Sequence, residues 1–294
     1  MQDSFGREIR YLRLSITDRC NLRCRYCMPD EGVPPTAHDD LLHYEELLRV
    51  AAAAVSLGID RFKVTGGEPL VRRGCTDFIR ALKALPGVKQ VTLTTNGLLL
   101  SPLLDELCAA GLDGVNISLD TLDNVQYQRL TRRAHTAGEV LDAVRLCAAH
   151  LPTRINAVLL PETADQMIPL AELAQTLPVD VRFIERMPLG AAQTDQTASA
   201  DHALARLRAR WPQLEPITEP RGNGPARYFH APALRGYIGL IDAVSHSFCD
   251  RCNRLRLTCT GLLKPCLCYD AGVELRPLLR GGAVETLSMA EYLP

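Results

Sequence analysis

The sequence predicts an α/β protein: a partial, TIM-like (β/α)6 barrel followed by a smaller C-terminal extension. Short apolar runs alternate with helical segments about six times along the first two thirds of the chain. Such alternation is typical of parallel strands joined by right-handed helical crossovers. The 294 residues do not suffice for eight such units plus the irregular C-terminal part, so an open barrel of six units fits better than a closed one of eight.

Six apolar runs are predicted as strands because they are short and bounded by polar or turn residues. They span residues 9–16, 62–65, 91–95, 115–119, 155–160 and 181–184. Between them, segment 44–57 carries Leu47, Ala51 and Ala54 at helical spacing and stops at Gly58. Similar spacing predicts helices at 75–85, 101–110, 137–149 and 165–176.

A small, polar segment at 190–199 is interpreted as a loop or linker. It divides the expected barrel domain, residues 1–190, from a C-terminal region, residues 191–294. That region contains one predicted helix, about 203–211, and a stretch rich in Gly, Pro and Cys. We expect it to be a smaller, irregular unit that bears an iron–sulfur cluster.

The overall charge excludes some classes of partner. Lys plus Arg number 33 and Asp plus Glu 34, so no global charge favours nucleic acid or a membrane surface. The sequence has no apolar run long enough to cross a bilayer, and its first residues lack the apolar core of a signal peptide. We therefore expect a soluble cytoplasmic protein with no nucleic-acid or membrane partner. In that reducing compartment, eleven cysteines are metal ligands or buried thiols rather than disulfides.

Three of these cysteines form a compact set near the N-terminus. Cys20, Cys24 and Cys27 have C-x3-C-x2-C spacing and follow the first predicted strand. Three thiolates so close together can hold three corners of a four-iron cluster and leave the fourth iron open. A zinc site or chance buried thiols are the alternatives.

A second set lies in the C-terminal region. Cys249 and Cys252 are followed by Cys266 fourteen residues later, which gives another three-thiol set. A zinc ribbon is the alternative, with Cys268 as its fourth ligand. Arg254 alternates with Leu255 in the following segment, so Arg254 and Arg256 would point the same way, beside the cluster.

The predicted strands also have polar faces, because successive side chains alternate sides. Leu12 and Leu14 lie opposite Arg13, and Lys63 and Arg154 occupy the corresponding polar side of their own strands. A solvent-exposed sheet face is the alternative, but intervening helices argue against it. Polar side chains inside a barrel need partners, so Arg13, Lys63 and Arg154 predict an anionic ligand such as a phosphate chain.

Two motifs together resemble the radical S-adenosylmethionine (SAM) superfamily. The first is the C-x3-C-x2-C run, with Tyr26 before its last cysteine, and the second is 65–69, Thr-Gly-Gly-Glu-Pro. The resemblance implies that Cys20, Cys24 and Cys27 hold a [4Fe–4S] cluster whose open iron binds SAM. Reductive cleavage of SAM then releases a 5′-deoxyadenosyl radical, while the glycines of 65–69 let the backbone approach the cofactor.

Further motifs narrow the resemblance to the GTP 3′,8-cyclase family of molybdenum-cofactor biosynthesis, over about residues 4–280. The motifs are Arg-Leu-Ser at 13–15, Tyr-Cys-Met-Pro at 26–29, Thr-Thr-Asn-Gly at 94–97, Ser-Leu-Asp at 118–120, Arg-Phe-Ile-Glu-Arg-Met at 182–187 and Phe-Cys-Asp-Arg-Cys-Asn-Arg-Leu-Arg at 248–256.

The resemblance assigns site residues, and it implies no catalytic side chain beyond the ligands of cluster and cofactor. The implied SAM contacts are Tyr26, Gly67, Ser118 and Met187. The implied GTP contacts are Arg13, Lys63, Thr94, Arg154, Arg254 and Arg256. The implied ligands of a second [4Fe–4S] cluster are Cys249, Cys252 and Cys266.

The implied reaction is a radical cyclisation of GTP to (8S)-3′,8-cyclo-7,8-dihydroguanosine 5′-triphosphate, the first step of molybdenum-cofactor biosynthesis. Implied partners are an electron donor, the downstream cyclic pyranopterin monophosphate synthase (the pathway's C protein), and a second copy of the chain in a homodimer. The alternatives are a radical SAM enzyme that modifies a peptide with the help of an auxiliary cluster, and a non-catalytic iron–sulfur or nucleotide-binding protein.

One departure from the family concerns the C-terminus. Family members end in a Gly-Gly tail, whereas this sequence stops at Pro294 and has its last Gly-Gly pair at 281–282. The comparison therefore predicts a shortened C-terminal segment.

Overall fold

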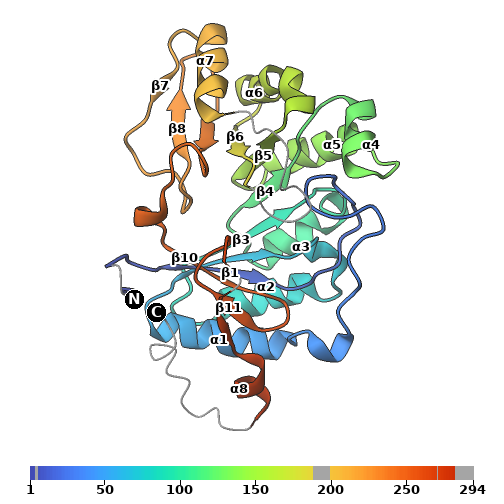
Figure 1. Ribbon diagram of the computed structural model, residues 1–294, viewed down its shortest axis with the longest axis vertical. Helices are drawn as coiled ribbons and strands as arrows, with labels where there is room; N and C mark the ends of the chain where they lie inside the picture. The colour runs from blue at the N-terminus through green and yellow to red at the C-terminus, as the bar shows by residue number, and fades with distance from the viewer. Residues whose placement is uncertain (4–5, 188–198, 270, 282–294) are drawn as a thin grey trace.

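The computed structural model describes residues 1–3, 6–187, 199–269 and 271–281, and within them one mixed sheet organises the chain (Figure 1). The strand order is β12-β11-β10-β1-β2-β3-β4-β5-β6-β9-β8-β7. The strands are β1 Tyr11–Ser15, β2 Arg61–Thr65, β3 Gln90–Thr95, β4 Val115–Ser118, β5 Thr153–Leu159, β6 Val179–Glu185, β7 Glu215–Pro216, β8 Arg227–His230, β9 Ile238–Ile241, β10 Arg254–Leu257, β11 Leu262–Lys264 and β12 Val273–Glu274.

The central strands of this sheet are all parallel. β1 to β6 follow one another in order, β10 adds to the free side of β1, and β9 adds to the free side of β6. Antiparallel pairs extend both ends, β11 and β12 beyond β10 and β8 and β7 beyond β9. No pairing joins β12 to β7 within the described residues, so the prediction of an open barrel is confirmed.

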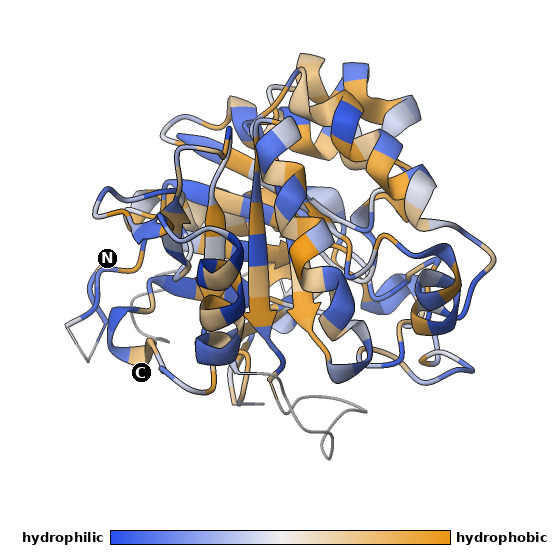
Figure 2. Cartoon of the chain, turned by 90° about the horizontal axis from the view of Figure 1, so that it is seen from above, coloured by the Kyte–Doolittle hydropathy of each residue, from blue (hydrophilic) through white to orange (hydrophobic). Residues whose placement is uncertain are grey.

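Helices follow the strands and cover the outer side of the sheet (Figure 1). They are α1 Tyr44–Ser56, α2 Cys75–Ala84, α3 Leu104–Ala109, α4 Asn124–Thr131, α5 Ala137–Ala148, α6 Met167–Thr176, α7 Ala200–Arg210 and α8 Arg276–Arg280. Short 3-10 turns occupy His38–Asp40, Pro69–Val71, Ser101–Leu103, Pro161–Gln166 and Cys249–Arg251. In Figure 2 most helices show hydrophilic and hydrophobic stretches together, as expected when one face packs on the sheet.

One core fills the space between the sheet and its helices. Leu12 and Leu14 of β1, Phe62 of β2 and Leu47 and Ala51 of α1 are completely or almost completely buried in a single apolar cluster. Burial of these outward-facing strand residues is the main stabilisation of the barrel, at roughly 25 cal/mol for each Å² of apolar surface removed from water. Because the apolar strand faces pack outward against the helices, the polar strand faces lie on the inner side of the sheet.

The six strands and five barrel helices are found where the sequence predicts them, with ends that shift by a few residues. Helix α4 was not predicted, since Asn124–Thr131 carries few apolar residues. The C-terminal region was expected to be irregular, but it adds strands to both ends of the sheet. Most of the predicted linker at 190–199, and the predicted shortening beyond Gly281, fall outside the described residues.

Strand register brings the polar residues of neighbouring strands to one level. Arg13 of β1 pairs with Lys63 of β2 on one side and with Arg256 of β10 on the other. Arg154 of β5 lies between Asn116 of β4 and Asp180 of β6. A parallel sheet places such partners side by side, so the cations converge although they are far apart in sequence.

Among the helices that the structure describes, none is both long and apolar enough to span a bilayer.

Candidate functional site

A large cavity lies on the inner side of the sheet and has a volume of about 930 Å³. Its walls include residues from the polar strand faces, namely Arg13, Lys63, Thr92, Asn116, Arg154, Asn156 and Arg182. The prediction that these faces line an interior space is confirmed. The volume is in the range that holds a nucleotide-sized ligand.

The cavity is strongly cationic. Burial lowers the pKa of Lys63 well below its usual value, and the nearby Arg182, Arg13 and Arg154 lower it further. Burial likewise lowers the pKa of Arg256, to about 9, with Arg13 as the next cause. Cations that repel one another inside a protein are stabilised when an anion binds among them.

Arg13 supports this conclusion through its own unsatisfied hydrogen-bonding group. Its Nε is buried and meets no hydrogen-bond acceptor within the described residues. Burial also lowers the pKa of its guanidinium. Because buried polar groups are normally paired, Arg13 is suited to an anionic ligand that supplies the acceptor.

Arg182 belongs to the same group of cations but was not singled out from the sequence. Its Nε donates to Asn156 Oδ1 at 2.9 Å and its Nη2 to Asn116 Oδ1 at 2.7 Å, which holds the guanidinium against the inner wall. Segment 181–184 was treated as an apolar run. Alternation would have found Arg182, since its neighbours Val181 and Phe183 face the core.

Arg154 differs from Arg13 because it has an acidic partner. Its Nε lies 3.4 Å from Asp180 Oδ2, and Arg221 forms two hydrogen bonds to the same carboxylate, at 2.9 and 2.8 Å. The side chain of Asp180 is only 4% exposed. One buried carboxylate therefore holds a cavity cation and a cation from the C-terminal region together.

The second cysteine set forms another wall of the cavity. Cys249, Cys252, Cys266 and Cys268 all line it, and so does Arg254. The main supporting bonds are from Arg7 Nη1 to the Cys249 carbonyl oxygen at 2.7 Å and from the Cys268 N–H to Cys266 Sγ at 3.4 Å. The three predicted ligands and Cys268 thus line the same cavity.

The first cysteine set lies on the loop after β1, at the C-terminal side of the strands. The Cys24 carbonyl accepts the N–H groups of Cys27 and Met28, both at 2.9 Å, which closes a tight turn. The N–H of Arg23 donates to the Thr131 carbonyl at 2.9 Å, which docks the loop on the end of α4. These cysteines are not among the residues that line the large cavity.

The turn at 66–68 packs directly against the segment that leads into Cys20. The Gly67 N–H donates to the Thr17 carbonyl and the Glu68 N–H to the Arg19 carbonyl, both at 2.8 Å. A Cβ on Gly67 would lie 2.3 Å from the Arg19 oxygen, a distance that no side chain tolerates. Only glycine permits this approach, and the approach sets the position of the cysteine loop beside β2.

Glu68 connects three of the predicted motifs, a role that sequence reasoning missed. Its buried carboxylate accepts from Thr95 Oγ1 at 2.8 Å, from the Asn96 N–H at 2.6 Å and from the Leu70 N–H at 3.1 Å. Asn96 Nδ2 in turn donates to Asn21 Oδ1 at 2.7 Å, inside the cysteine loop. The loop, the 65–69 turn and the 94–97 turn therefore form one hydrogen-bonded unit.

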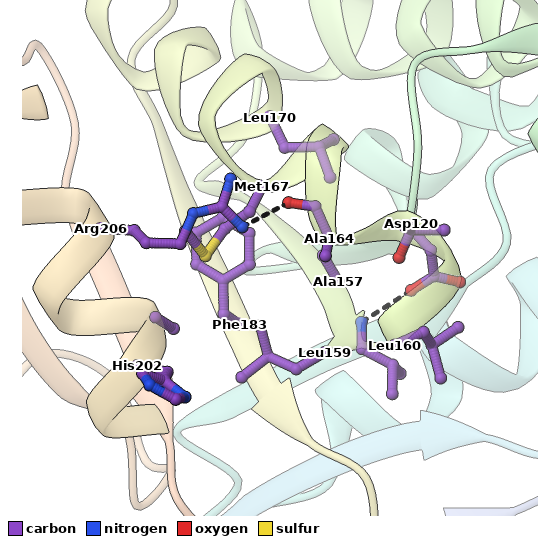
Figure 3. Close-up of a pocket in the computed structure, with 13 residues that line it drawn as sticks. Asp120, Ala157, Leu159, Leu160, Ala164, Met167, Leu170, Phe183, His202 and Arg206 are labelled. Carbon is purple, nitrogen blue, oxygen red and sulfur yellow. Dashed lines mark hydrogen bonds between the residues drawn. The ribbon is translucent and has the colours of Figure 1, made fainter. Parts of the chain in front are cut away.

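Tyr26, an expected SAM contact, uses its hydroxyl within the protein. The hydroxyl donates to Asp120 Oδ2 at 2.8 Å. Asp120, which is labelled in Figure 3, also accepts the Val158 N–H through its Oδ1 at 2.7 Å. Burial raises the pKa of Asp120 to about 6. The Tyr26 ring, and not its hydroxyl, is thus the part available to a ligand.

The other expected contacts are distributed over two levels. Met187 lines the large cavity, whereas Gly67 and Ser118 lie at the carboxyl ends of β2 and β4 outside its lining. Thr94 accepts a hydrogen bond from Asn116 Nδ2 at 3.3 Å and is also outside that lining. Contact of these residues with SAM or GTP stays a prediction.

A second, smaller cavity lies between β5, β6, α6 and α7 (Figure 3). It measures about 50 Å³, and apolar side chains such as Met167, Leu170 and Phe183 form much of its wall. A space of this size holds at most a water molecule or two. The large cavity is therefore the candidate site.

Both cysteine sets consist of free thiols. All eleven cysteines are free. No three His, Cys, Asp or Glu side chains within the described ranges converge on a single-ion centre. The choice between an iron–sulfur cluster and a zinc ion at the second set stays a prediction.

Comparison with known proteins identifies the family. Residues 14–174 match the radical SAM superfamily, and residues 179–293 match the family described as Molybdenum Cofactor Synthesis C. The GTP 3′,8-cyclase of Moorella thermoacetica is 45% identical over 291 residues, 97% of this chain and 90% of that protein. The GTP 3′,8-cyclase of Geobacter sulfurreducens is 45% identical over 282 residues, 94% and 86% of the two chains.

A solved structure supports the fold separately. SuiB of Streptococcus suis, in its complex with S-adenosylmethionine, has a TM-score of 0.69 at 15% identity and covers 92% of this chain and 65% of its own. At that identity the likeness concerns the fold alone. The sequence matches extend over both the barrel and the C-terminal region, so the chain belongs to the GTP 3′,8-cyclase family of the radical SAM superfamily.

Proposed function

We propose that this protein converts GTP to (8S)-3′,8-cyclo-7,8-dihydroguanosine 5′-triphosphate, the first step of molybdenum-cofactor biosynthesis. The observation that carries the proposal is the cation-lined cavity whose wall contains the second cysteine set. Arg13, Lys63 and Arg182 supply positive charge on the sheet side, and Arg254 and Arg256 supply it beside the second set. A nucleoside triphosphate has the charge and size that this space requires.

The first cysteine set belongs to the radical SAM part of the chain, which uses one [4Fe–4S] cluster together with SAM. When bound, these groups supply a hydrogen-abstracting radical. The residues of this chain hold the cluster through Cys20, Cys24 and Cys27. Gly67 lets its turn pack on the segment that leads into Cys20, which fixes the cysteine loop beside the proposed SAM position. Tyr26, Ser118 and Met187 complete the proposed SAM contacts.

The cavity residues orient the substrate. Arg13, Lys63, Thr94, Arg154, Arg254 and Arg256 are the proposed GTP contacts. Fixed cations of this kind neutralise a triphosphate and hold the attached ribose in one place, and such orientation supplies much of the rate in a reaction between two positioned groups. Cys249, Cys252 and Cys266 are the proposed ligands of a second [4Fe–4S] cluster, at the wall that faces the cations.

The proposal extends to organisation and partners. We place the boundary between barrel domain and cluster-bearing C-terminal region at residues 190 and 191. Free thiols in every cysteine position support a reducing, cytoplasmic location. An electron donor must supply reducing equivalents. Cyclic pyranopterin monophosphate synthase would consume the product, and the chain would act as a homodimer.

Anaerobic reconstitution with iron, sulfide, SAM, a strong reductant and GTP tests the function. We expect 5′-deoxyadenosine and the cyclised nucleotide in equal amounts. Deoxyadenosine without any cyclised nucleotide would point to another radical SAM substrate, such as a peptide. GTP binding without either product would indicate a protein that binds the nucleotide but does not catalyse the reaction.

A further inference from the structure

Residues 221–225, here called the floor segment, close one end of the cavity. Gly222, Asn223, Gly224 and Pro225 all line it. The segment connects β7 to β8 but lies against the beginnings of the barrel strands, because its partners are the first residues of β2 and β3 and the second residue of β6. It therefore forms a wall at the amino-terminal ends of the strands.

Asn223 fastens the middle of the floor segment to two strands. Its Oδ1 accepts from Arg61 Nη1 at 2.6 Å, and its Nδ2 donates to Gln90 Oε1. Both ends of the amide are thus in use, one on β2 and one on β3. The Asn223 side chain, and not backbone pairing, therefore holds the middle of the floor segment in place.

Arg221 fastens the beginning of the segment. Its guanidinium makes the two-pronged contact with the buried Asp180 carboxylate and lies 3.7 Å from the centre of the Tyr237 ring. Asp180 also lies beside Arg154. A paired, stacked arginine is rigid, so the segment and the Arg154 guanidinium keep a fixed relation to each other.

The backbone of the floor segment has hydrogen-bond donors next to the Arg154 guanidinium. The N–H groups of Gly222, Asn223 and Gly224 donate to no partner within the described residues. Gly222 has a φ of +78°, and a Cβ there would lie 3.5 Å from Arg154 Nη2. A Cβ on Gly224 would meet no atom within 4 Å. Unpaired amides beside a guanidinium, with open space in front, form a surface suited to a phosphate group.

We propose that the floor segment sets the length of the phosphate chain that the cavity accepts. The inference rests on the proposed function, since it takes the ligand to be a nucleoside triphosphate. The terminal phosphate lies in the open space in front of Gly224, beside the Arg154 guanidinium that packs on Gly222, where it meets backbone donors and fixed positive charge. A monophosphate does not reach this end, so it forgoes those contacts, and a diphosphate gains only part of them.

Two variants test the segment from opposite directions. Asn223→Ala removes both fastening bonds and lets the segment move. Gly224→Val adds side-chain bulk to open space at a residue whose φ is not positive, so it occupies the proposed phosphate position without straining the backbone. Arg210→Ala is the control, because Arg210 forms an exposed ion pair with Glu172 outside the cavity.

The measurement is anaerobic calorimetric titration of each reconstituted protein with GTP, GDP and GMP. For the wild type we expect affinity to fall with each phosphate removed. Both floor variants should weaken GTP binding by about tenfold while GMP affinity stays unchanged. Arg210→Ala should bind all three nucleotides as the wild type does.

The inference is overturned if both floor variants keep the wild-type ratio of GTP to GMP affinity, or if they lose affinity for GMP as much as for GTP. Failure of the wild type to bind GTP at all would overturn the proposed function together with this inference. Normal GTP binding by the wild type, with an unchanged ratio in the variants, would overturn the inference alone.

Discussion

The two cysteine sets differ in how much of the protein supports them. The loop of the first set is tied to the rest of the barrel by backbone bonds to α4, by the Asn21–Asn96 bond and by the Tyr26–Asp120 bond. Within the described residues the second set has fewer ties, chiefly Arg7 to the Cys249 carbonyl, although each set contains one exposed cysteine, Cys27 or Cys249. The fold supports the first set through several contacts and the second set through fewer.

This difference is consistent with the chemistry assigned to each region. A site that must hold a cofactor and a reactive intermediate in one geometry benefits from rigid support. A site that meets a substrate benefits from nearby charge, and the second set has Arg254 and Arg256 beside it. The predictions below test the comparison, beginning with the change of largest expected effect.

Replacing Glu68 tests the support of the first set. Glu68→Ala leaves the buried donors of Leu70, Thr95 and Asn96 without an acceptor, so we expect the free energy of unfolding to fall by about 3 kcal/mol or more. Urea unfolding measures it, and iron analysis should show loss from the first set. The control is Glu172→Ala, whose exposed ion pair contributes about 0–1 kcal/mol. Equal stability of the two variants would contradict the assigned role.

Replacing Arg254 separates substrate binding from support of the second set. Its guanidinium lines the cavity and lies 5.3 Å from the Phe248 ring centre, and it makes no contact with a cysteine that the described residues show. Arg254→Ala should weaken GTP binding by about tenfold or more, since a charge-assisted contact is lost. Iron content should not change. Loss of iron in this variant would mean that Arg254 is structural.

A matched pair of arginines compares the two sets directly. Arg7 donates to the Cys249 carbonyl at 2.7 Å, and Arg132 donates to the Met28 carbonyl at 3.2 Å, beside the first set. Arg7→Ala should speed the loss of iron to a chelator by about fivefold, the effect of roughly 1 kcal/mol. Arg132→Ala should change that rate less, because its loop has other ties. Equal rates in the two variants would remove the contrast between the sets.

Asp120, which supports the loop of the first cysteine set, should make the folding stability depend on pH. Its pKa is about 6 in the folded chain against 3.8 for the free group, so the folded state binds more protons between those values. Stability from this residue therefore falls as pH rises from about 4 to 6, by about 1 kcal/mol between pH 5 and pH 7. Asp120→Asn should flatten this part of the curve in urea unfolding at the two pH values. An unchanged slope would exclude Asp120 as its source.

The barrel could be predicted because its signals are local. Each strand from β1 to β6 contains a short apolar run, and the predicted helices that cover the strands carry periodic apolar residues. The inner position of Arg13, Lys63 and Arg154 followed from alternation along those strands. Arg182 obeys the same rule, and it was missed only because its strand was treated as apolar throughout.

The remaining features depend on contacts between distant parts of the chain. β10 has four residues and lies beside β1. No local sequence pattern indicates that β1 is its partner. Glu68 was recognised as part of a motif, but its acceptor role became visible only when β3 lay next to β2. The floor segment could not be found for the same reason, since Asn223 reaches Arg61 and Gln90 across the sheet.

The pairing of β10 with β1 has a consequence for how the molecule is made. Tyr11 pairs with Arg254, so one wall of the cavity joins the beginning of the chain to a strand that leaves the ribosome much later. Contacts of such long sequence separation form slowly, because a large loop must close first. The six-stranded barrel with its first cysteine set can therefore assemble during synthesis, and the substrate chamber is completed only afterwards. A chain interrupted before β10 would contain the first cysteine set but would lack this wall of the cavity.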